Sequence, residues 1–169
     1  MEEFLKTDFL FKSDYIIEAI RIDTIYSALF SQKNTLSWKP WILKESQLEE
    51  LLSQPIELIP SLKIVKTHWD FIENRPRVLK NPDVKIVYEN IPKTWLIFRN
   101  EENLFYSKPV HPLAIDILRK MQSGDTILNI LGELQNTLSA KELDVLQSNL
   151  QSWFKDWTNW KIFKQPEVT

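Results

Sequence analysis

Apolar residues recur at helical spacing over residues 13–32 and predict a helix there, with Ser13 or Asp14 as its N-cap. Residues 15–22 are rich in β-branched side chains, so a strand remains an alternative for the first half of this segment. A capping box from Ser46 to Glu49 predicts a short second helix, and residues 63–71 alternate as an extended segment. The N-terminal part is therefore predicted to be mainly helical.

A polar stretch over residues 74–83, which contains Pro76 and Pro82, predicts a break between two regions, 1–75 and 76–169. Beyond it, residues 84–88, 94–99 and 104–107 are short β-prone runs, and a polar turn over 100–103 joins the last two. Three short strands with tight connections predict an antiparallel meander.

Helical patterns fill the rest of the chain. Pro112 is suited to a first helical turn, Gly124 to a helix C-terminus, and Asp125 or Thr126 to the next N-cap. Ser139 and Glu142 form a capping box that opens a long helix with an apolar seam. The seam residues are Leu143, Leu146, Leu150, Trp153, Trp157 and Trp160. We therefore expect an α+β fold, with a helical N-terminal part, a three-stranded antiparallel sheet and a three-helix, winged-helix-like C-terminal domain.

Scarce residue types narrow the chemistry of this 169-residue chain. The chain has only two glycines, and they form no glycine-rich motif, which excludes the usual phosphate-binding loops. The absence of cysteine excludes disulfides, thiol nucleophiles and zinc knuckles. The two histidines are distant in sequence: a structural role is favoured for His68, and a capping or surface role for His111. A stand-alone enzyme that uses His111 with carboxylates is a further, less favoured alternative. We expect no catalytic residues, no metal ligands and no cofactor in this chain.

The net charge of −2 disfavours bulk attraction to nucleic acid or to an anionic membrane. The acidic start and the absence of a long apolar run predict a cytoplasmic protein without a membrane span. A winged-helix DNA-binding regulator is the alternative function, but the long last helix carries Lys141 and Lys155 against three acidic residues. That helix would repel the DNA backbone.

Peptide capture is a second use of such a scaffold, because an extended peptide can add a strand to a sheet edge. If the strand before the helices is an edge, it would form a groove with the long last helix, and Tyr106→Pro would block the pairing. The candidate peptide-binding residues are Leu104, Phe105, Tyr106, Ser107, Leu143, Leu146, Leu150 and Trp153. Phe105 and Tyr106 should point to opposite faces of the sheet, so one of the two side chains should be free to contact a bound peptide.

Residues 84–165 resemble the peptide-recognition elements of ribosomal-peptide natural-product pathways, in the strand meander, the 112–124 helix that ends at a glycine, and the aromatic end of the last helix. From about Arg21 the chain is similar to the small partner subunits of multinuclear iron peptide oxidases, the methanobactin-type partners in particular. This wider likeness rests on residues 20–30, the extended stretch after Pro60, residues 95–99 and residues 150–163.

The resemblance implies a non-catalytic accessory subunit. It would bind the leader of a precursor peptide and form a heterodimer with a larger oxidase subunit that holds the iron. Its N-terminal half would dock on that enzyme. Among the seven tryptophans, Trp38 and Trp41 in the irregular loop, or Trp157 and Trp160 at the helix end, are the predicted docking residues.

Overall fold

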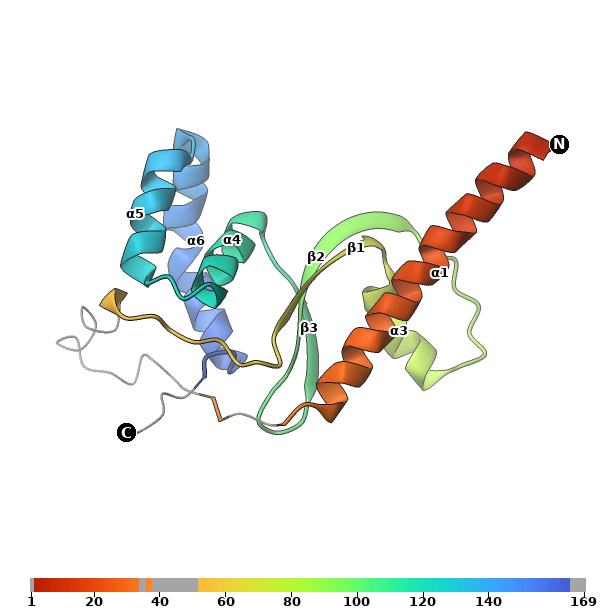
Figure 1. The fold of residues 1–169 in the computed structure, drawn as a ribbon, viewed down its shortest axis with the longest axis horizontal. Helices are drawn as coiled ribbons and strands as arrows, with labels where there is room; N and C mark the ends of the chain where they lie inside the picture. Colours follow the sequence, from red (N-terminus) through yellow and green to blue (C-terminus); the bar gives the residue numbers. More distant parts are fainter. Residues whose placement is uncertain (1, 34–35, 38–51, 165–169) are drawn as a thin grey trace.

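The computed structural model describes residues 2–33, 36–37 and 52–164, with side chains from residue 14 onward. Figure 1 shows α4, α5 and α6 gathered at one end of the molecule and α1 and α3 at the other, with the sheet between them. The elements are α1 (Glu2–Ser31), β1 (Lys63–Trp69), α3 (Phe71–Lys80), β2 (Asn90–Arg99), β3 (Phe105–Pro109), α4 (Pro112–Gln122), α5 (Ile127–Thr137) and α6 (Ala140–Asn159). The α+β class is confirmed.

The three strands form one antiparallel sheet in the order β1-β2-β3, so β2 is central. Val65 pairs with Trp95 across β1 and β2, and Ile97 pairs with Ser107 across β2 and β3. Successive side chains of a strand point to opposite faces, so the apolar run of β2 supplies both faces of the sheet. This explains why residues 95–98 are all buried.

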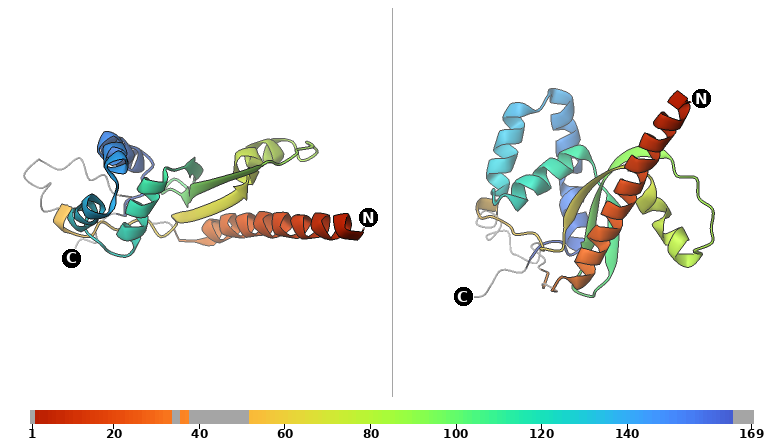
Figure 2. Two further views of the ribbon diagram at one scale, coloured as in Figure 1. Left: turned by 90° about the horizontal axis from the view of Figure 1, so that it is seen from above. Right: turned by 45° about the vertical axis from the view of Figure 1, so that its right-hand side comes forward.

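Each face of the sheet packs on its own set of helices. On one face, Trp95 and Ile97 join buried residues of α1 and α3, among them Ile22, Leu29 and Ile72. On the other face, Leu96 and Phe98 join the larger core formed with α4, α5 and α6. Figure 2 shows that the N-terminal part of α1 extends beyond the sheet.

Arg99 fixes the C-terminal end of α1 to the sheet. Its guanidinium donates to the carbonyl oxygen of Phe30 at 2.6 Å and to that of Gln32. The last carbonyls of a helix lack intrahelical partners and carry a partial negative charge, so a buried cation suits them. This contact sets the path by which α1 crosses toward β3.

The strand predicted over residues 84–88 is wrong. Its alternation is present, with Val84, Ile86 and Tyr88 half-buried, but the segment forms no strand. Both sides of β2 are already occupied, because β1 pairs on one side and β3 on the other. The extended segment predicted over 63–71 supplies β1 instead, and Phe71 begins α3.

The break predicted over residues 74–83 is for the most part helix α3, which contains Pro76. Phe71 and Ile72 are buried, and the Asn74 side chain donates to the Asp70 carboxylate at 2.6 Å, so packing and side-chain bonds hold the helix despite the proline. The division expected after residue 75 therefore falls inside a helix. Strands from both sides of it share one sheet.

The helix predicted over residues 13–32 is part of α1, so the strand alternative for 15–22 is wrong. α1 begins at Glu2, so the N-cap predicted at Ser13 or Asp14 is wrong as well. Local capping residues do mark the later helices. Thr126 caps α5, Ser139 and Glu142 form the capping box of α6, and Gly124 has a φ of 88° just after α4. The short helix predicted from Ser46 begins outside the described residues. No helix in the described ranges is long and apolar enough to cross a membrane.

Candidate functional site

The two edges of the sheet differ in what covers them. At the β1 edge, the buried Glu18 carboxylate of α1 accepts from the backbone N–H groups of His68 and Trp69 at 2.9 and 3.0 Å. The Arg21 guanidinium donates to the carbonyl oxygen of Lys66 at 2.5 Å. These backbone groups are the ones that a further strand would need. α1 therefore blocks the β1 edge.

The β3 edge is open among the described residues. Two backbone hydrogen bonds bound the β2–β3 ladder: the Asn100 N–H donates to the carbonyl oxygen of Leu104, and the Val110 N–H donates to that of Thr94. Bonded and non-bonded pairs alternate in an antiparallel ladder, so Tyr106 and Lys108 bond inward to β2. The N–H and C=O groups of Phe105 and Ser107 point away from β2, toward a side on which no described strand pairs with them. β3 is therefore an edge strand of the sheet, which is the condition that the peptide-capture hypothesis sets.

The side chains of β3 divide between two environments. Phe105 and Ser107 face α1: the Ser107 and Tyr26 hydroxyls lie 2.5 Å apart, and the Phe105 ring lies 6.1 Å from that of Tyr26. Tyr106 faces the other way and stacks on Phe98 at 5.3 Å. The predicted alternation is confirmed. Phe105 is the more exposed of the two rings.

The groove predicted between β3 and the long helix is largely occupied by the core. Leu146 is 4% exposed and belongs to that core, so it cannot line a groove. Leu143, Leu150 and Trp153 are partly buried against the same core, and Trp153 stacks on His111 at 5.5 Å. Leu104 is exposed beside the turn. Lys108 of β3 instead lies over the ring of Trp160, near the end of α6.

The predicted docking tryptophans have different outcomes. Trp157 is 1% exposed and packs in the core of α4–α6, so the prediction that it docks a partner is wrong in this fold. Trp160 is partly buried, and its ring lies 6.3 Å from that of Phe98. Trp38 and Trp41 lie outside the described residues.

Both histidines have structural partners. The Nδ1 atom of His111 accepts from the N–H of Leu113 and caps α4, and the Nδ1 atom of His68 lies 3.0 Å from the Glu18 carboxylate. The interpretation of His111 as a capping residue is confirmed. Within the described ranges no three acidic or histidine side chains are grouped so that they could hold a metal ion.

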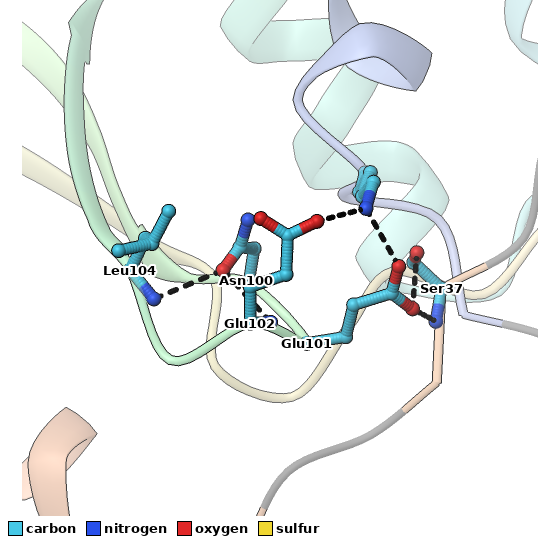
Figure 3. A network of polar contacts seen from close by, with 6 residues as sticks. Ser37, Asn100, Glu101, Glu102 and Leu104 are labelled. Atoms are coloured by element: carbon cyan, nitrogen blue, oxygen red, sulfur yellow. Dashed lines mark hydrogen bonds and ion pairs between the residues drawn. The ribbon is translucent and has the colours of Figure 1, made fainter.

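A polar network fixes the turn that precedes β3 (Figure 3). Glu101 accepts from the N–H and hydroxyl of Ser37 and from the ammonium group of Lys161, which also reaches Glu102 at 2.6 Å. The Asn100 side chain accepts from the N–H of Leu104 at 3.0 Å and closes the turn. The start of the open edge is thereby held against the end of α6.

This network predicts an acid-sensitive contribution to stability. The hydrogen bond from Lys161, followed by those from Ser37, lowers the pKa of Glu101 from 4.5 to about 2. Because the folded-state pKa is depressed, the contribution is complete above pH 4.5 and is lost as the pH falls toward 2. The pair is partly exposed, so we expect about 1 kcal/mol. Urea unfolding at pH 6 and pH 2.5 should show this extra loss in the wild type but not in Glu101→Gln.

A pocket beside the open edge was not predicted from the sequence. It has a volume of about 750 Å³ and lies between α1, α3 and the β2–β3 side of the sheet. Its lining includes Tyr26, Phe30, Arg75, Leu79, Trp95 and Phe105. In the sequence only the apolar residues within 25–30 point to it, because Arg75 and Leu79 lie in the stretch whose composition predicts a break.

No protein-family model matches this chain, and neither a curated protein nor a solved structure matches it. In the structure, the open β3 edge, the blocked β1 edge and the pocket beside them are the features that bear on function.

Proposed function

We propose that this chain binds an extended precursor peptide as a fourth strand along β3, as the non-catalytic accessory subunit of a larger, iron-containing peptide oxidase in the cytoplasm. The peptide would be the leader of a ribosomal precursor in a methanobactin-like pathway. The difference between the two sheet edges supports the binding mode. Glu18 and Arg21 cover β1, whereas the outward backbone groups of β3 have no partner among the described residues.

The open edge offers two donors and two acceptors, from Phe105 and Ser107. Pro109, which has no N–H, ends the row of donors. At about 1 kcal/mol per bond these groups supply roughly 4 kcal/mol, which corresponds to a dissociation constant of about 1 mM. Main-chain pairing alone is therefore weak. The side chains of the peptide must supply the remaining affinity and the specificity.

The iron oxidase partner follows from the sequence resemblance. No second function is favoured, because the long helix α6 carries Lys141 and Lys155 against Glu142, Asp144 and Asp156. A recognition helix with that balance does not attract a DNA backbone.

The test is co-expression of the tagged chain with the open reading frames beside its gene. The variants are chosen from the register of β3. Ser107→Pro removes an outward N–H and leaves the β2 ladder intact, as Pro109 already does two residues later. Ser107→Ala is the matched control, because it removes the bond to Tyr26 and keeps the N–H. Tyr106→Pro is unsuitable, since the Tyr106 amide bonds inward to β2.

We expect a larger iron-containing protein and a short precursor peptide to co-elute with the wild type and with Ser107→Ala. With Ser107→Pro the larger protein should still co-elute, and the affinity for the precursor should fall about tenfold or more. Retention of full precursor affinity by a folded Ser107→Pro protein would refute strand addition. Elution of the wild-type chain alone would refute the accessory-subunit role.

A further inference from the structure

The pocket and the open edge share two residues. Phe105 and Ser107 present their backbone groups outward, and their side chains line the pocket. A peptide paired antiparallel with β3 would place its residues opposite Phe105 and Ser107 on this same face, with Cβ atoms about 5 Å away. Side chains at these two peptide positions would lie at the pocket.

The pocket has an apolar surface that the described part of the chain leaves uncovered. Phe30 is 71% exposed, Leu79 is 68% exposed and Phe105 is 39% exposed. All three line the pocket, with Trp95 and Tyr26 in the same lining. Soluble proteins seldom gather large apolar side chains at a surface hollow without a binding role. A volume of about 750 Å³ is ample for one large side chain.

Arg75 adds a polar preference to this apolar site. Its guanidinium lies 4.0 Å from the centre of the Tyr26 ring, and its Nε atom is buried without a hydrogen-bond partner. The Asp23 carboxylate lies 3.9 Å from the Arg75 guanidinium and is 78% exposed, so this ion pair is weak. The Arg75 side chain is 27% exposed, so the accessible part of its guanidinium can still donate a charge-assisted hydrogen bond to a ligand carboxylate.

We infer that the pocket takes one large apolar side chain of the bound strand, and that Arg75 pairs with an acidic side chain two residues away on the same face of that strand. This inference rests on the proposed strand addition at β3. It places specificity on the α1–α3 face, opposite the groove with the long helix that the sequence predicts. The preferred ligand is therefore an extended peptide of the pattern apolar-x-acidic, or the reverse order.

The probe is a displayed library of random dodecapeptides, selected on the full chain. We expect enriched peptides to carry a large apolar residue and Asp or Glu two positions apart. Leu79→Glu introduces a charge at the rim and should weaken these peptides at least tenfold. Leu128→Glu, at an exposed position of α5, is the matched control and should bind as the wild type does. Arg75→Gln should remove the acidic preference and weaken binding about fivefold.

The outcomes separate this inference from the proposed function. Peptides that are sensitive to Ser107→Pro but indifferent to Leu79→Glu, with no fixed apolar position, would overturn the pocket assignment and leave strand addition standing. Peptides that are indifferent to Ser107→Pro would overturn strand addition itself. A concentration-dependent dimer that Ser107→Pro and Leu79→Glu both abolish would identify a second copy as the occupant and overturn the peptide assignment.

Discussion

Trp157→Ala is expected to lower the free energy of unfolding by about 3–5 kcal/mol. The side chain is 1% exposed, and its ring lies 4.9 Å from that of Phe154 in the core shared by α4, α5 and α6. Truncation removes a large buried surface and leaves a cavity that neighbouring helices cannot close. A domain of this size is stable by about 5–15 kcal/mol, so the variant should lose a large part of its stability.

Urea unfolding followed by circular dichroism measures this loss. Trp160→Ala is the control, because Trp160 is only partly buried and should cost less. An unchanged midpoint for Trp157→Ala would contradict the placement of this residue in the core. The result also bears on docking. Any weakening of a partner complex by Trp157→Ala should be accompanied by unfolding, whereas a true docking residue would weaken the complex in a fully folded protein.

Trp157 and Trp160 differ in a property that their spacing in the sequence does not predict. The spacing of Trp153, Trp157 and Trp160 correctly identifies one face of α6, but periodicity does not state whether the face meets the chain's own core or a partner. The structure distinguishes the two residues by their burial: Trp157 is buried, and Trp160 is half-buried beside Lys108.

The strands show the same limit. Residues 63–69 and 84–88 have similar alternation, and only the former pairs with β2. Strand pairing is a long-range choice, decided by which segment can bury Val65 against Trp95. By contrast, the boundaries of α4, α5 and α6 are set by local capping residues such as Thr126 and Ser139, and these were predictable.

For the candidate site, the sequence locates β3 and the opposite orientations of Phe105 and Tyr106. It misses the pocket, because Tyr26, Arg75 and Phe105 are brought together only by the path of α1 across the sheet. That path depends on contacts between residues far apart in the chain, Arg99 with Phe30 and Glu18 with Trp69. No local sequence pattern predicts these long-range contacts.

Removing the side-chain contact by which α1 covers the β1 edge is expected to lower the free energy of unfolding substantially. Glu18→Ala removes the carboxylate that accepts from the N–H groups of His68 and Trp69 beneath α1. Each unsatisfied buried donor costs about 1–3 kcal/mol, so we expect a loss of about 2–4 kcal/mol. Glu18→Gln keeps an acceptor oxygen and should cost less. Asp14→Ala, at an exposed position of the same helix, is the control and should be nearly neutral.

The same change should alter association as well as stability. The double variant Glu18→Ala/Arg21→Ala leaves the outward groups of Lys66, His68 and Trp69 without the side chains that occupy them, which turns β1 into a second open edge. Size-exclusion chromatography with light scattering should then show concentration-dependent oligomers. If the double variant stays monomeric and as stable as the wild type, Glu18 and Arg21 do not prevent another strand from pairing with β1. If it oligomerises, α1 limits the sheet to one open edge, and a peptide that adds a strand has a single edge to join.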